Sequence, residues 1–348
     1  MTSSHAILDR LLAAGDIDLA RGPLFDRVLP ARPDLDFGRV EGMLLGLAIG
    51  DALGRPLAGE PDEERQRRLA DAEGYQPNPL AGGRAVGLPS DETQLAFWTL
   101  EHLCQAGQLR PGRLMTRLAG GRIFGVGATT REALEAFRAG ALPWERCGLK
   151  APSSGALPRL APLLLPHLAG GGTELWVDLA LATLMTHNDS AALSAGLAWG
   201  ALLWDLLGMF ETPPSAWWLE TCLAAVEGLE VDPTYRLSGP AFRGQGGDTL
   251  AGHLARCLHR ADEEGWDAVQ ASAAWGSGGS LLEVLPSVLF ILSRHADDPR
   301  EALRQAVVAS RVPDRVASLV GAAVGALHGH DALPQDWVRD LLGRTAED

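Results

Sequence analysis

Apolar and polar positions recur along most of the chain with the spacing of amphipathic α-helices. From residue 90 onward, Gly, Pro, Asn or Asp residues separate most of the apolar segments. Alternating runs of Val, Ile and Thr, which favour strands, are nearly absent. The sequence therefore predicts an all-α fold, a compact single-domain helical bundle. The predicted helices cover residues 90–105, 111–119, 130–139, 156–168, 174–186, 190–210, 215–228, 247–262, 266–274, 279–294, 299–310, 314–328 and 335–343.

The first 37 residues stand apart from this pattern. A short amphipathic helix is predicted at residues 6–14, and three prolines interrupt the segment that follows. We interpret residues 1–37 as an N-terminal extension, either an arm or a cap, and residues 38–348 as the helical domain. The extension is our candidate for contact with a protein partner. A connection with one short helix at 61–72 is expected after residue 58.

The first segment of the domain carries glycines at every fourth position, namely Gly42, Gly46, Gly50 and Gly54. Each glycine inside a helix costs about 1 kcal/mol relative to alanine. A spacing of four places all of them on one side of a helix, which then has no side chains. The pattern predicts that another backbone or a ligand approaches this side closely.

The net charge of −14 argues against bulk nucleic-acid binding, which needs an excess of Lys and Arg. None of the four cysteines forms a C-x-x-C pair, so no zinc knuckle or redox motif is predicted. Residues 191–210 are long and apolar enough for a membrane span but contain Asp205, and we expect a helix buried in the bundle. The N-terminus lacks the features of a signal peptide. We expect a cytoplasmic protein with no membrane contact.

The segment Ser90-Asp91-Glu92-Thr93 combines two carboxylates with hydroxyl groups. Such oxygen ligands are those that Mg²⁺ or Mn²⁺ prefers. The same residues are also typical of a plain helix start, with Ser90 as N-cap and the acids near the positive end of the helix dipole. Residues 312–315 likewise resemble a helix start, with Pro313 in the first turn.

Two loops rich in small residues each precede a predicted helix, at residues 125–130 and at 153–155. Free amides at helix starts bind phosphate or sugar hydroxyls, although such loops also serve as ordinary caps. His187 lies in a short segment between two strong helices, where Asp189 is expected to cap the second one. From the residues alone, both the ligand-binding and the capping interpretations stay open.

Taken in order, these segments resemble the ADP-ribosylglycohydrolase family. The family opening G-x-L-x-G-x-A-x-G-D-A-L-G-x-P is matched by residues 42–56, and its T-D-D-T motif by residues 90–93, followed by the expected Gln94. The segments G-x-G-A-T-T, S-A-G-N-G-A-x-x-R-x-A-P-L, T-H-x-D and G-A-x-x-G-A-L-x-G are matched at residues 125–130, 151–163 (loosely), 186–189 and 321–329.

The resemblance implies an all-α fold around two divalent ions that hold the ribose hydroxyls of ADP-ribose. It implies ADP-ribose or an ADP-ribosylated macromolecule as ligand, and cleavage of the glycosidic bond at ribose C1 as the reaction. The metal ligands implied are Ser90, Asp91, Glu92 and Asp314, and the catalytic residues are Asp91, Glu92 and Glu60. The substrate-binding residues implied are Gly125, Gly127, Thr129, Ser153, Ser154, Gly155 and His187.

The late family motif G-G-D-S-D-T falls on residues 310–315, where two chemically important positions differ. The first aspartate is replaced by Val312, which cannot bind a metal, whereas the second is retained as Asp314. The terminal Thr or Ser is replaced by Arg315, a permanent cation. We therefore expect one Mg²⁺ or Mn²⁺ ion rather than two. Arg315 is predicted to take the place of the other ion and to pair with Asp91, Glu92 or Asp314.

Two further family positions differ. The glutamate that assists the chemistry falls on Ala58, with Glu60 two residues later as its only nearby substitute, and the asparagine of the fourth segment is Ser154. We predict a protein that binds ADP-ribose or an ADP-ribosylated target and hydrolyses poorly. One alternative is a non-catalytic family member, for example an immunity-type protein that acts against an ADP-ribosylating partner. The other is an enzyme that uses one metal on a different nucleoside or glycoside.

Overall fold

The computed structural model describes residues 3–70, 74–231, 235–236, 239–243 and 245–342. The described residues form sixteen α-helices, seven short 3-10 helices and one two-stranded antiparallel sheet. The helices are α1 (Ser4–Ala14), α2 (Phe37–Gly54), α3 (Asp62–Ala70), α4 (Asp91–Ala106), α5 (Pro111–Gly120), α6 (Ala128–Arg138), α7 (Leu165–Leu168), α8 (Glu174–Leu184), α9 (Ser190–Leu207), α10 (Ser215–Val226), α11 (Leu250–Glu264), α12 (Ala268–Trp275), α13 (Leu281–His295), α14 (Pro299–Ala309), α15 (Pro313–His328) and α16 (Gln335–Leu342). The strands are β1 (Pro77–Asn78) and β2 (Arg84–Ala85), and the 3-10 helices are η1 (Pro23–Asp26), η2 (Arg55–Leu57), η3 (Pro79–Ala81), η4 (Trp144–Arg146), η5 (Pro158–Leu164), η6 (Pro240–Phe242) and η7 (His330–Ala332).

The all-α prediction is confirmed, and most predicted helices are present within a few residues of their expected ends. The segment 156–168 was predicted as one α-helix and is the exception. It forms the 3-10 helix η5 followed by the single turn α7. Pro158, Pro162 and Pro166 recur every fourth residue here. Each proline removes an amide donor from the α-helical ladder, so the segment cannot hold a continuous α-helix.

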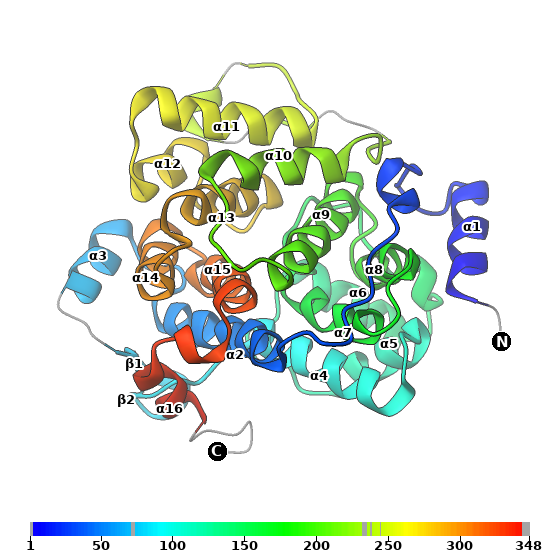
Figure 1. Cartoon of the computed structure of the whole chain (residues 1–348), viewed down its shortest axis with the longest axis horizontal. Coiled ribbons are helices and arrows are strands. Elements are labelled where there is room, and N and C mark those ends of the chain that lie inside the picture. Colours follow the sequence, from blue (N-terminus) through cyan, green and yellow to red (C-terminus); the bar gives the residue numbers. More distant parts are fainter. Residues whose placement is uncertain (1–2, 71–73, 232–234, 237–238, 244, 343–348) are drawn as a thin grey trace.

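Helices α2 and α15 touch along the glycine side of α2, near the middle of the molecule (Figure 1). A Cβ atom on Gly46 would overlap the carbonyl oxygen of Gly321, and one on Gly321 would overlap the carbonyl oxygen of Gly46. Gly42 and Gly325 are related in the same way. The close backbone approach predicted from the four-residue spacing is therefore confirmed, and its partner is a helix more than 250 positions later in the chain.

Helix α9 lies in the hydrophobic core, as predicted for residues 191–210. It is long and apolar enough to cross a membrane by length and composition alone, yet 94% of it is buried inside the protein. Its one acidic residue, Asp205, forms an ion pair with Arg27. The charge inside the apolar segment is therefore paired with a cation from the N-terminal extension.

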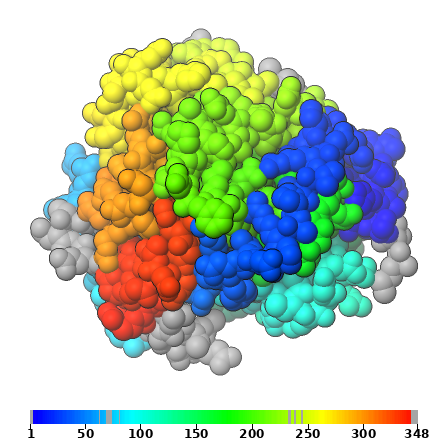
Figure 2. Space-filling view, viewed as in Figure 1, coloured from blue at the N-terminus to red at the C-terminus, as the bar shows by residue number. Residues whose placement is uncertain are grey.

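The N-terminal extension packs against the body of the protein, as Figure 2 shows for the blue segment on this face. Leu8 and Leu11 of α1 are buried, and α1 packs on α8. The side chain of Asn188 binds the extension through the amide of Asp18 at 2.9 Å and the carbonyl of Asp16 at 3.0 Å. Of the two forms we expected, these contacts are those of a docked cap. A role of the extension in binding a protein partner stays a prediction.

The contact between α2 and α15 makes a prediction for stability. Replacing Gly46 by alanine is expected to lower the free energy of unfolding by about 1–3 kcal/mol or more, because the new methyl group meets backbone atoms that cannot move aside. Gly120→Ala is the matched control, since a Cβ there meets nothing within 4 Å. It should be neutral or stabilising by up to about 1 kcal/mol. Urea denaturation measures both variants, and equal stability of the two would contradict the prediction.

Candidate functional site

Asp51, in the last turn of α2, connects this helix to the start of α4. Its two carboxylate oxygens accept four hydrogen bonds, from the amide and hydroxyl of Ser90 at 2.8 and 2.7 Å and from those of Thr93 at 3.0 and 2.7 Å. Ser90 occupies the N-cap position of α4, but its hydroxyl donates to Asp51 and makes no capping bond. The segment therefore begins a helix with Ser90 at the N-cap, as one of the two interpretations expected, but without the side-chain capping bond. Burial raises the pKa of Asp51 to about 7, and the Ser90 and Thr93 hydrogen bonds oppose the rise.

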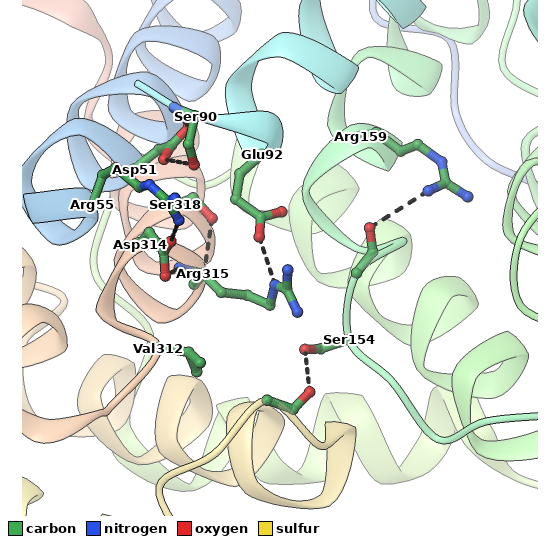
Figure 3. Close-up of polar contacts among 12 residues, drawn as sticks. Asp51, Arg55, Ser90, Glu92, Ser154, Arg159, Val312, Asp314, Arg315 and Ser318 are labelled. Atoms are coloured by element: carbon green, nitrogen blue, oxygen red, sulfur yellow. Dashed lines mark hydrogen bonds and ion pairs between the residues drawn. The ribbon is translucent and has the colours of Figure 1, made fainter. Parts of the chain in front are cut away.

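Glu92 and Arg315 form a buried ion pair, with 2.6 Å between Glu92 Oε1 and Arg315 Nε (Figure 3). The two side chains are only 2% and 13% exposed, so water screens the pair poorly. Burial raises the pKa of Glu92 well above its usual value, and Arg315 opposes this. Burial alone would lower the pKa of Arg315, but the neighbouring carboxylates outweigh it and raise the pKa. The pairing predicted for Arg315 is confirmed.

The guanidinium of Arg55 pairs with Asp314, the predicted metal ligand on α15. Arg55 Nη1 lies 3.2 Å from Asp314 Oδ2, and Asp314 Oδ1 accepts from the amide of Arg315 at 3.1 Å. Arg55 directly follows α2, and Asp314 lies in the first turn of α15. The close packing of α2 and α15 therefore brings Arg55, Asp314 and Arg315 together, and Glu92 reaches the same cluster from α4 (Figure 3).

Asp91 belongs to the same cluster but is not paired. It is buried and lies within electrostatic range of Arg315, Asp314 and Arg55. Its carboxylate accepts a hydrogen bond from its own amide, and no described residue gives it another hydrogen bond or a close ion pair. Burial raises the pKa of Asp91, and Arg315 opposes the rise. Asp91, Glu92 and Asp314 therefore lie within electrostatic range of one another, whereas Ser90 bonds to Asp51.

Two glycine loops border the guanidiniums. Gly125 has a φ of 88°, and a Cβ there would lie 3.0 Å from Arg55 Cζ. A Cβ on Gly127 would lie 3.5 Å from Arg315 Nη2, and one on Gly279 would lie 3.9 Å from Arg315 Nη1. Gly127 and Gly279 therefore lie beside the two terminal nitrogens of Arg315 without a side chain that could cover them.

Gln94 holds the first of these loops in place. Its side-chain amide donates to the carbonyl of Arg122 at 2.8 Å and accepts from the amide of Phe124 at 3.1 Å. The loop around Gly279 is fixed by Ser154, whose hydroxyl donates to the Gly279 carbonyl at 3.1 Å (Figure 3). Both glycine loops thus have a side-chain support that does not involve the carboxylates.

The far side of the site contains a buried cation without a carboxylate partner, Arg159. Its Nη2 donates to the Thr186 hydroxyl at 2.5 Å and to the Ala182 carbonyl at 3.0 Å. Burial lowers the pKa of Arg159 to about 10, opposed by Glu92. Because the Thr186 oxygen already accepts from Arg159, its single proton is available for His187 Nδ1 at 2.7 Å.

His187 Nε2 is buried and has no hydrogen-bond partner among the described residues. A Cβ on Gly155 would lie 3.6 Å from it and 3.3 Å from the Thr130 hydroxyl. Burial lowers the pKa of His187 well below its usual value, with Arg159 and Arg315 adding to the effect, so the imidazole is neutral. His187 and Gly155 therefore face one another at the edge of the site, as candidate binding residues.

The remaining predicted site residues make no described contact with the charged cluster around Arg315. Thr129 is partly exposed on α6, and Ser153 forms a backbone bridge with Ser280. Glu60 is not brought into the cluster, because its carboxylate lies 3.8 Å from Arg68 and makes no described contact with Glu92. Its part in the chemistry stays a prediction that the contacts do not support.

The four residues predicted as metal ligands do not form a donor set that fits a divalent ion in this arrangement. Glu92 and Asp314 are already paired with guanidiniums, and the Ser90 hydroxyl is committed to Asp51. That leaves the carboxylate of Asp91. Among the described residues, no group of three or more acidic, His or Cys side chains is arranged to hold a metal. The predicted Mg²⁺ or Mn²⁺ ion stays a prediction.

Three residues of the cluster and its surroundings have no predicted role in the sequence. Asp51 and Arg55 stand inside the glycine-rich opening segment, and Arg159 stands in the segment at residues 151–163. Each is a charged residue in a segment of otherwise apolar or small residues, and this contrast was the feature of the sequence that could have pointed to it. Their partners lie 39, 259 and 27 positions away, which spacing along the chain does not reveal.

A model of the ADP-ribosylglycohydrolase family matches residues 32–348. A protein named ADP-ribosylarginine hydrolase Tri1, from Pseudomonas putida (strain GB-1), is 25% identical over 333 residues, covering 91% of this chain and 78% of the relative. A protein of the same name from Serratia proteamaculans (strain 568) is 23% identical, covering 90% and 78%. A solved structure of an ADP-ribosylglycohydrolase-related protein complex is 28% identical with a TM-score of 0.61, covering 87% of this chain and 92% of the other.

The pKa of Asp51 makes a prediction for the pH dependence of stability. The folded chain holds this proton up to a pH of about 7, whereas the usual value is 3.8. The folded state therefore binds more protons between these values, and the free energy of unfolding falls as pH rises through them. Asp51→Asn should reduce this slope by up to about 1.4 kcal/mol per pH unit. Urea denaturation at pH 5, 6, 7 and 8 tests this, and identical slopes would show that Asp51 is already ionised at pH 5.

Proposed function

The chain belongs to the ADP-ribosylglycohydrolase family, and we propose that its site binds the ADP-ribosyl group, free or attached to a macromolecule. The observation that supports this most directly is the assembly of distant segments around Arg315. Glu92 contacts it directly, Gly127 borders Nη2, and Gly279 borders Nη1 and is held by Ser154. A polar ligand would meet charged groups on one side and side-chain-free backbone on the other, a combination suited to close contact with a sugar.

We further propose that hydrolysis of the ribose C1 bond is slow in this chain. Glu92 is held by Arg315 at 2.6 Å, so it is a poor base or acid for a reacting water. Ala58 offers no carboxylate, and Glu60 is turned toward Arg68. Val312 presents a hydrocarbon side chain beside Gly279. A general acid or base contributes about 10²–10⁴ in rate, so its absence alone would be costly.

Binding is testable with the protein as it stands. ADP-ribose should raise the apparent stability, by about 2.7 kcal/mol when its concentration is 100 times Kd. AMP, which lacks the second ribose and the diphosphate, is the comparison ligand and should stabilise less. Thermal unfolding followed by calorimetry measures the shift. No shift with millimolar ADP-ribose would show that the site does not bind this group.

Hydrolysis is testable with ADP-ribosylarginine, the substrate class in the name of the two Tri1 relatives. We expect turnover far below that of a relative with an intact motif, and a gain in rate when Ala58→Glu, Val312→Asp and Arg315→Thr are combined. The three changes act on one reaction, so their effects need not add. Release of ADP-ribose is followed by chromatography in Mg²⁺ or Mn²⁺. Turnover by the unaltered chain equal to that of the intact relative would refute slow hydrolysis.

A further inference from the structure

We propose that Arg315 is a built-in cation that replaces a divalent ion, so that ligand hydroxyls bind to its terminal nitrogens without any metal. This inference rests on the proposed function and adds to it the chemistry by which the sugar is held. It concerns residues in which this chain differs from the family pattern, namely Arg315 together with Val312.

The geometry of the guanidinium is the first support. Arg315 uses Nε for Glu92, whereas Nη1 and Nη2 have no hydrogen bond with any described residue. Both nitrogens lie next to glycines, Gly279 and Gly127, whose side chains cannot cover them. The side chain is 13% exposed, so part of it can be reached from outside. An arginine placed only to neutralise Glu92 would be expected to use its terminal nitrogens on the protein as well.

The charge of the cluster is the second support. Asp91, Glu92 and Asp314 are within electrostatic range of one another, and burying them together would be very costly without cations. Arg55 and Arg315 provide two positive charges for three carboxylates. A divalent ion that used Glu92 or Asp314 as a ligand would have to displace the guanidinium that the carboxylate already holds.

The remaining unpaired carboxylate indicates which ligand chemistry fits. An anionic group at Arg315 would stand close to Asp91, whose charge has no close partner. A pair of neighbouring hydroxyl groups suits the same place better. One hydroxyl can accept from the Arg315 nitrogens while donating its own proton to Asp91, so both charged groups gain hydrogen bonds and no charge is added. A ribose diol is such a group, and a phosphate is not.

The first experiment measures Mn²⁺ binding to the protein and needs no sugar ligand. Mn²⁺ is titrated into the unaltered chain and into the double variant Val312→Asp, Arg315→Thr, with calorimetry and the Mn²⁺ magnetic resonance signal as readouts. We expect no saturable site below millimolar Mn²⁺ in the unaltered chain and a new site in the variant. A tight Mn²⁺ site in the unaltered chain would overturn the proposal. This result is independent of ADP-ribose, so it judges the inference even if the proposed function fails.

The second experiment measures ligand binding by calorimetry in EDTA and again in Mg²⁺, with ADP-ribose and with ADP, which lacks the second ribose. The Kd of ADP-ribose should be the same in both buffers. Arg315→Lys keeps the charge but loses the forked donors, and Arg315→Gln loses the charge. Each should weaken ADP-ribose by about 10- to 100-fold, while ADP changes by much less.

Arg117→Gln is the matched control, because Arg117 pairs with Glu101 on an exposed surface of α5. It should leave both ligands unaffected. Unfolding curves establish that each variant is folded, and Arg315→Lys remains informative if Arg315→Gln is not. Binding of ADP-ribose that requires Mg²⁺, or that is unchanged in folded Arg315 variants, would overturn the inference while leaving the proposed function intact. Absence of ADP-ribose binding to the unaltered chain would instead refute the proposed function.

Discussion

The close contact between α2 and α15 is the constraint on which the site depends. The two helices meet backbone to backbone, and the glycines of each leave room for the carbonyl groups of the other. Asp51 and Arg55 stand at the end of this contact on one helix, with Asp314 and Arg315 on the other. Since charge pairs weaken steeply with separation in a poorly hydrated site, a small displacement of the helices would change every interaction in the cluster.

Guanidiniums supplied by the protein itself explain how several carboxylates are tolerated in a buried position. An exchangeable ion balances carboxylates only while it is bound, whereas a guanidinium on the helix is present as soon as the chain folds. The guanidinium offers directed hydrogen bonds but cannot act as a Lewis acid or lower the pKa of a bound water. The proposed replacement of an ion by Arg315 would therefore keep the means to recognise oxygen-rich groups and lose part of the means to activate water.

The sequence was sufficient to predict local structure and the family. It did not reveal most of the hydrogen-bond and ion-pair partners of the site residues. Helix positions and the glycine side of α2 follow from spacing, and the Arg315 pairing follows from a cation standing where the family has a metal ligand. Residues 158–164 form a 3-10 helix and not the predicted α-helix, because prolines at every fourth position remove amide donors that an α-helix needs. The sequence left the Ser90 hydroxyl open between a metal ligand and a helix cap, because its acceptor, Asp51, lies 39 positions away. Glu60 was chosen for its place in the sequence, and the backbone turn after Ala58 directs it toward α3.

Different side chains hold the glycine loops and the carboxylates, which bears on how the proposed binding and hydrolysis can separate. Gln94 and Ser154 hold the two glycine loops through amide and hydroxyl groups, and neither uses a carboxylate of the cluster. The carboxylates are instead held by α2 and α15 through Asp51, Arg55 and Arg315. We therefore expect a substitution of the Arg315 side chain to alter the charges of the cluster while Gln94 and Ser154 keep their bonds to the glycine loops.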